Sequence, residues 1–156
     1  MIKKILVPLD GSKLAEKALP YAESFALKYQ AEVTLLWVLQ HPTVVPMDYG
    51  GVGVPPVDTM MEKEEARNYL NRLRTEFEQQ NIPTRVAVLK SHSVADAIID
   101  LARKEGMDMI VKTTHGRSGL SRWLFGNVAA KVLQQAPCPV FLVRVSGQDR
   151  TAADGG

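Results

Sequence analysis

The run "KKILVPL", residues 3–9, decides the fold class, because its apolar side chains are nearly continuous along the chain. A strand that packs on both of its faces has this pattern, and strands of that kind belong to parallel sheets. Further runs rich in Val, Ile and Leu follow at residues 31–39, 84–90, 107–114 and 139–145. We therefore expect five buried strands in one parallel sheet.

Helical patterns alternate with these runs. They are expected after Ser12, from about Thr59 to Gln80, between Ser93 and Gly106, and from Asn127 to just before Pro137, with Ser12 and Ser93 as N-cap residues. The side chains expected to face inward are Leu14, Ala18, Ala22 and Phe25, then Ala66, Leu70, Leu73 and Phe77, then Ala97, Ile98 and Leu101, and finally Val128, Val132 and Leu133. Pro20 should interrupt and bend the first helix, since it has no N–H to donate. Right-handed crossovers then give an open α/β sheet with helices on both faces.

The length of 156 residues suits a single domain, which we place at residues 1–146. The polar, Gly-rich stretch 147–156 is expected to be a flexible tail. The connection from Gln40 to Asp58 is rich in Pro and Gly and is too long for an ordinary link between a strand and a helix. Connections of that length are usually functional or mobile, and the role of this one stays open.

Composition excludes several classes of protein. An apolar content of 46%, a charged content of 23% and a net charge of +2 are ordinary for a soluble protein and give no support for a nucleic-acid or membrane partner. The single Cys138 excludes an internal disulfide and a cysteine zinc cluster, and we expect a buried or half-buried, non-catalytic thiol. The three histidines lack metal-ligand spacing, so no metal site is expected. No run resembles a membrane span or a complete signal peptide, and we expect a cytoplasmic protein.

In open α/β sheets, the ligand crevice lies beyond the carboxyl ends of the strands, where the strand order reverses. This rule points to "PLDGS", residues 8–12, and to "TTHGRSG", residues 113–119. Neither stretch contains a P-loop or a Rossmann glycine fingerprint. The segment "GRSG" is one residue short of a hydrolase elbow, so Ser118 is not expected to be a nucleophile.

A glycine-spaced loop that runs into a helix remains at residues 113–127. Gly116 and Gly126 permit close backbone approach, and free N–H groups at the start of the following helix favour an anion. Asn127 can cap that helix through its side chain. A phosphate site is one interpretation of this loop. The alternative is that its glycines only make a long turn and Asn127 only caps.

Four stretches, in the order and spacing of this chain, are similar to the universal stress protein family: "ILVPLDGS", "VTLLWV", "THGRSGLSRWLFGNVAAKVL" and "APCPVFLVR". The resemblance covers nearly the full length. It implies a Rossmann-like, adenine nucleotide alpha hydrolase-like fold with strand order 3-2-1-4-5. It also implies a stress-response sensor or regulator that binds ATP or AMP, with any Mg²⁺ held through the phosphates. Such a protein is not an enzyme beyond slow, incidental hydrolysis.

ATP-binding members of this family have a G-x2-G-x9-G-[ST] loop after the fourth strand, whereas other members lack the loop and bind no nucleotide. In this chain Thr113 takes the place of the first glycine, Gly116 and Gly126 keep the next two, and Asn127 replaces the hydroxyl residue. Two of the four motif positions are therefore kept. Thr113 lacks the freedom of a glycine near the ribose, while Asn127 keeps a polar side chain and its backbone N–H.

The resemblance assigns a set of nucleotide-binding positions, of which the last five would line the phosphates: Pro8, Leu9, Asp10, Val38, Lys112, Thr113, His115, Gly116, Gly126, Asn127 and Val128. Asp10 would face the adenine, and Lys112 and Thr113 would flank the ribose at the rim. Asp10 is also a normal turn or cap residue, and His115 can orient a turn without touching a ligand. Trp37 is expected to belong to the core.

The fifth run lies at a sheet edge in this strand order, and Val140 to Val145 contains no proline. An edge of this kind invites pairing with another chain, and the resemblance implies a homodimer through antiparallel pairing of this strand. A second hypothesis is a nucleotide-free, dimeric interaction module of the same fold. A third hypothesis, an adenylate-handling enzyme, finds no catalytic set in the sequence. The stress and the partner stay open.

Overall fold

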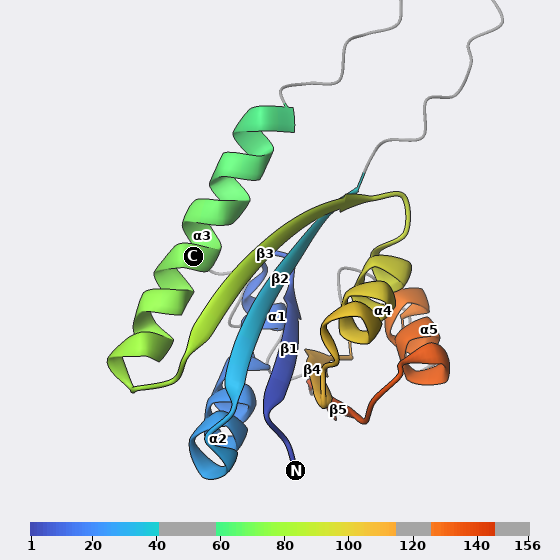
Figure 1. Ribbon diagram of the computed structural model, residues 1–156. Coiled ribbons are helices and arrows are strands. Elements are labelled where there is room, and N and C mark those ends of the chain that lie inside the picture. Colours follow the sequence, from blue (N-terminus) through green and yellow to red (C-terminus); the bar gives the residue numbers. More distant parts are fainter. Residues whose placement is uncertain (41–58, 115–125, 146–156) are drawn as a thin grey trace, which may run out of the picture.

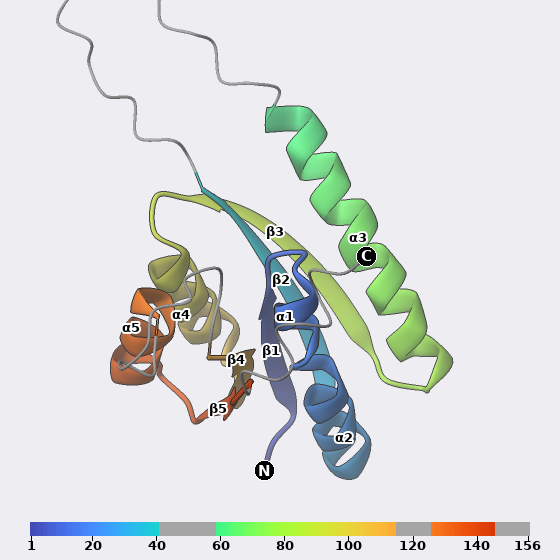
Figure 2. The same cartoon turned by 180° about the vertical axis from the view of Figure 1, so that it is seen from behind.

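The computed structural model describes residues 1–40, 59–114 and 126–145, which form a five-stranded parallel sheet with helices on both faces (Figures 1 and 2). In chain order the elements are β1 (Lys4–Leu9), α1 (Lys13–Glu16), α2 (Leu19–Tyr29), β2 (Glu32–Gln40), α3 (Thr59–Gln79), β3 (Thr84–Ser91), α4 (Val94–Glu105), β4 (Met109–Thr113), α5 (Asn127–Gln135) and β5 (Val140–Val143). The strand order is β3-β2-β1-β4-β5 and every pair is parallel, which confirms the expected fold. The order reverses between β1 and β4.

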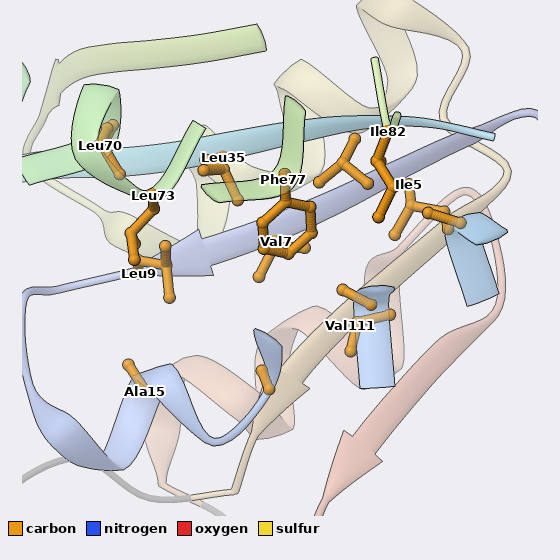
Figure 3. Close-up of a cluster of buried hydrophobic side chains, with 14 of the residues drawn as sticks. Ile5, Val7, Leu9, Ala15, Leu35, Leu70, Leu73, Phe77, Ile82 and Val111 are labelled. Atoms are coloured by element: carbon orange, nitrogen blue, oxygen red, sulfur yellow. The ribbon is translucent and has the colours of Figure 1, made fainter. Parts of the chain in front are cut away.

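The continuous apolar runs contribute side chains to two hydrophobic cores, because successive side chains of a strand point to opposite faces of the sheet. Ile5, Val7 and Leu9 of β1 pack in a cluster with α1, α2 and α3, part of which is drawn in Figure 3. Leu6 of the same strand packs in a second cluster with α4 and α5. The sheet is thus the middle layer between α1, α2 and α3 on one face and α4 and α5 on the other (Figure 1).

Pro20 interrupts the first helical segment, as expected, and the segment forms two helices instead of one bent helix. The chain forms two helices there, α1 and α2, and Pro20 lies in the first turn of α2. The physical reason is that Pro20 has no N–H to donate to the carbonyl of Glu16, four residues earlier. The cap predictions are confirmed: Ser12 accepts from the Ala15 N–H at 3.1 Å, and Ser93 accepts from the Asp96 N–H at 3.2 Å.

The last helix differs from its predicted pattern in one inward position. Leu133 was expected to face the core, but its side chain is 40% exposed. Ala129 and Val132 are the buried residues of α5, so its inward face is rotated from the expected one. The predicted tail at 147–156 and the connection at 41–58 lie outside the described residues.

Candidate functional site

A cavity of about 810 Å³ opens at the carboxyl ends of β1, β2 and β4, where the strand order reverses. Its lining comes from both sides of the sheet: α3 contributes from one side, and α4 and α5 contribute from the other. The polar or aromatic side chains among the described lining residues are Asp10, Trp37, Gln40, Glu62, Glu65, Tyr69, Lys112 and Thr113. The cavity therefore lies where the fold rule places a ligand crevice.

Most of the predicted site residues that the structure describes meet at this one cavity, namely Pro8, Leu9, Asp10, Val38, Lys112, Thr113 and Val128. Gly126 and Asn127 directly precede Val128 in the chain but do not line the cavity themselves. His115 and Gly116 lie outside the described residues. Segments far apart in the sequence are brought together because the carboxyl ends of parallel strands meet at one edge of the sheet.

Asp10 makes a turn and lines the cavity at the same time. Its Oδ1 accepts the Ser12 backbone N–H at 2.9 Å and the Ser12 hydroxyl at 2.6 Å. These bonds confirm that Asp10 is a turn residue, since an aspartate often bonds the backbone two residues on. Within the described part of the chain no bond is made to Oδ2. A ligand in the cavity can therefore reach one carboxylate oxygen of Asp10 while the other holds the turn.

Lys112 brings a positive charge to the cavity from inside the sheet. It is the residue before last in β4, and its side chain is half-buried. Its Nζ donates to the carbonyl of Thr113 at 3.0 Å. Burial lowers the pKa of Lys112, and the attraction of Asp10 opposes that shift. The ammonium therefore pays a desolvation cost that a nearby anion would offset.

Thr113 replaces a glycine of the family loop without strain in its backbone. It is the last residue of β4, pairs with Val143 in the sheet register, and is 5% exposed. Among the described residues other than glycine, only Gln30 and Asn81 have a positive φ. A side chain at position 113 therefore costs no backbone strain, and its effect is limited to the space that it takes at the cavity wall.

The start of α5 differs from the prediction that Asn127 caps this helix. Gly126 is the N-cap, with φ −60° and ψ 157°, and Asn127 is the first helical residue. No side-chain cap is present and the first turn holds no acidic residue. The first N–H groups of the helix therefore have no side-chain acceptor, and they favour an anion. A Cβ added at Gly126 would meet no described atom within 4 Å.

Sequence reasoning missed the aromatic part of the cavity wall. Trp37 packs beside the core as expected, but it also lines the cavity, with its ring centroid 5.3 Å from that of Tyr69 at 81°. Gly11 has φ +78°, and a Cβ there would lie 2.4 Å from Cη2 of Trp37. Glycine is therefore required both for the turn and for the close approach of the indole ring.

Tyr69 and two carboxylates reach the cavity from α3. The Tyr69 hydroxyl donates to Oε1 of Glu16 at 3.0 Å, and burial, followed by this bond, raises the pKa of Tyr69. Glu65 and Glu62 lie about one and two turns before Tyr69 on the same helix and line the same cavity. The helical spacing of these residues was visible in the sequence, but the packing of α3 beside the end of β2 was not.

Other chemistry has little support in the described part of the chain. Residues 1–40, 59–114 and 126–145 contain no group of three metal-ligating side chains placed to hold an ion. Cys138 is half-buried, as expected, and burial raises the pKa of its thiol. None of the helices in these ranges combines the length and the apolar character that a membrane crossing requires.

Known proteins share this architecture. The model described as "Universal stress protein family" matches residues 1–144. Universal stress protein MJ0531 of Methanocaldococcus jannaschii is 32% identical over 149 residues, covering 92% of this chain and 83% of that protein. The solved structure of MJ0577 from the same organism has a TM-score of 0.75 at 26% identity and covers 94% of this chain and 99% of its own. A universal stress protein in complex with cAMP has a TM-score of 0.69 at 18% identity and covers 92% and 98%, which is a likeness of fold.

Proposed function

The chain belongs to the universal stress protein family, and on that premise we propose that its cavity binds an adenine nucleotide, ATP or AMP. The nucleotide would make the protein a sensor or regulator of a stress response in the cytoplasm. One observation supports this proposal above the others: the cavity lies at the reversal of strand order, where most of the described positions assigned by the family resemblance meet.

The size and the lining of the cavity fit a nucleotide. Its volume of about 810 Å³ lies within the range of roughly 300 to 1,000 Å³ that is typical of ligand pockets. Pro8, Leu9 and Val38 offer apolar contacts and main-chain groups to a base, and Asp10 offers an acceptor to its amino group or to a ribose hydroxyl. A relative of the same fold was solved in complex with cAMP, which is also an adenine nucleotide.

The phosphates would lie toward the start of α5. The first N–H groups of this helix have no side-chain cap, and Val128 in its first turn lines the cavity to which Lys112 brings an ammonium. Mg²⁺, if it takes part, would be held through the phosphate oxygens. We propose no catalytic role, because the described lining residues do not include a nucleophile beside an activating base.

The substitution Gly126→Val tests this placement of the phosphates. A Cβ at position 126 would meet no described atom within 4 Å, so we expect the steric effect of Val to fall on the ligand. Loss of the small cap residue should cost at most about 1 kcal/mol of unfolding free energy. We expect calorimetric titration to show ATP binding at least about tenfold weaker, which corresponds to about 1.4 kcal/mol.

The matched control is Gly126→Ala, which changes the same cap but adds a single methyl group. Its binding should lie between those of the wild type and Gly126→Val. Unchanged ATP binding by a folded Gly126→Val protein would place the phosphates elsewhere. A wild-type protein that binds no adenine nucleotide would instead favour the second candidate, a nucleotide-free module, which the two altered motif positions Thr113 and Asn127 support.

We also propose that the protein forms a homodimer through the edge strand β5. This strand is at one end of the sheet and pairs with β4 on its inner side. Its Leu142 is half-buried, yet it belongs to neither cluster of the core. Antiparallel pairing with a second copy would satisfy the edge of the strand and cover this side chain.

A further inference from the structure

We propose that Lys112 recognises the phosphate of the bound ligand and supplies the side-chain charge by which the cavity selects nucleotides over nucleosides. This inference rests on the nucleotide-binding function proposed above and adds to it the residue that detects charge. It would also make recognition of a monophosphate independent of a divalent metal.

The distribution of charge in the cavity supports this role. Lys112 is the cation among the described lining residues, whereas Asp10, Glu62 and Glu65 bring carboxylates. A phosphate is repelled by those carboxylates and needs an opposing charge to enter. Without Lys112 the charged groups of the described lining would all be anionic, which disfavours a phosphate ester relative to a neutral nucleoside.

The cation and the carboxylates of α3 come from opposite sides of the sheet. Ile110, two residues before Lys112 in β4, packs in the cluster with α4 and α5. Side chains two apart in a strand share a face, so Lys112 extends on the side of α5. Helix α3 packs in the other cluster. A ligand lying across the strand ends can therefore place its phosphate at Lys112 and its donor groups toward the acidic side.

The hydrogen bonds of the ammonium leave room for a ligand. An ammonium has three N–H donors, and that of Lys112 uses one on the carbonyl of Thr113 at 3.0 Å. Asp10 attracts the ammonium, but the described residues contain no ion pair between the two. The remaining donors are suited to phosphate oxygens, which accept strong charge-assisted hydrogen bonds.

A purely structural role for Lys112 predicts a different outcome. In that role its bond to the Thr113 carbonyl would secure the end of β4, and its removal would weaken AMP and adenosine binding alike. A role in phosphate recognition predicts that AMP binding falls while adenosine binding stays. The ratio of the two affinities therefore separates the alternatives, because AMP and adenosine differ only in the phosphate.

The experiment is a calorimetric titration of wild-type, Lys112→Met and Lys112→Arg proteins with AMP and with adenosine, in EDTA. Methionine keeps the apolar stem and loses the charge, and arginine keeps the charge. We expect the wild type to bind AMP at least about tenfold more tightly than adenosine. Lys112→Met should lose that preference, with adenosine binding within about twofold of the wild type, and Lys112→Arg should retain much of it.

Three results would overturn the proposal. They are a Lys112→Met protein that still prefers AMP, a wild type without any preference for AMP in EDTA, and a Lys112→Met protein that loses affinity for AMP and adenosine equally. Adenosine binding would survive in the first two cases, so the proposed site would stand. A wild type that binds neither ligand would overturn both proposals.

A second measurement does not depend on affinity. Lysine side chains labelled with ¹³C report the pKa of Lys112 by NMR, with the signal assigned by its absence from Lys112→Met. A phosphate beside the ammonium favours the charged form, so AMP should raise the pKa of Lys112 and adenosine should not. The same pKa with both ligands would place the phosphate away from Lys112.

Discussion

At the scale of single residues, the contact between Gly11 and Trp37 links the fold to the cavity. Gly11 has a left-handed backbone and lies against the indole ring, which in turn lines the cavity beside Tyr69. The glycine of "PLDGS" was visible in the sequence as a turn signal. The contact of Gly11 with Trp37 was not visible, because it joins the turn after β1 to the end of the neighbouring strand β2.

Gly11→Ala should destabilise the protein more than a simple backbone change would. A positive φ costs an alanine roughly 1 to 2 kcal/mol, and the displacement of Trp37 should add roughly 1 to 3 kcal/mol. Urea unfolding measures the sum. The same change should weaken ATP binding, because the moved indole alters the cavity wall.

Gly106→Ala is the matched control for this prediction. Gly106 also has a positive φ, of +62°, but a Cβ there would meet no described atom within 4 Å. The unfolding free energy of this variant should fall by only about 1 kcal/mol, and its ATP affinity should stay unchanged. Equal losses of unfolding free energy for the two variants would show that the contact with Trp37 does not restrict which side chain position 11 can hold.

At the scale of elements, the sequence predicted the strands and helix caps better than the helix faces. Apolar runs locate strands because a strand buried on both faces of a sheet needs consecutive apolar residues, and such a run can be read from the local sequence. Ser12 and Ser93 could be recognised because a cap bonds a backbone N–H three residues away. Leu133 was misassigned because the packing of α5 on α4 determines which face of the helix is buried, and Asn127 was misassigned because the helix starts with Gly126 as its N-cap.

Asp108 joins two of these elements and makes stability depend on pH. Its Oδ2 accepts the backbone N–H groups of Lys3 and Lys4 at 2.8 and 2.9 Å, which fastens the start of β1 to the turn before β4. The bond from Lys3 is the first cause of a lowered pKa of Asp108. A carboxyl whose pKa is lower in the folded protein stabilises it above the unfolded value of 3.8.

The stabilisation by Asp108 should therefore disappear as the pH falls from about 3.8 through the lower native pKa. Asp108→Asn keeps an acceptor oxygen but cannot titrate, and Asp108→Ala removes both. Near neutral pH we expect the Asn variant to be less stable than the wild type by about 1 kcal/mol and the Ala variant by more. These differences should shrink in strong acid. A constant gap between wild type and Asp108→Asn at every pH would contradict this account.

At the scale of the whole molecule, strand order determines both the position of the cavity and the free edge. A cavity lies at the ends of β1 and β4, where a crevice was expected, because parallel strands end at one edge of the sheet. The part of the wall from α3, with Tyr69, Glu62 and Glu65, could not be predicted, because it depends on how a distant helix packs over the sheet.

The edge strand β5 gives a test of the proposed homodimer. Leu142→Lys places a charge beside its own copy in an antiparallel pair, and it should convert dimers to monomers. Leu133→Lys is the control, since Leu133 is exposed on α5 and lies outside the strand. Analytical sedimentation of the wild type and both variants measures their oligomeric state. A monomeric wild type, or a Leu142→Lys protein that remains dimeric, would rule out this interface.

The central claim is that the cavity at the strand ends holds an adenine nucleotide. The most direct measurement is a calorimetric titration of the nucleotide-free protein with ATP, after denaturation of a purified sample has shown whether an adenine nucleotide was carried through purification. We predict saturable binding of one nucleotide per chain. No nucleotide in the purified protein, together with no saturable binding up to millimolar ATP, would contradict the claim.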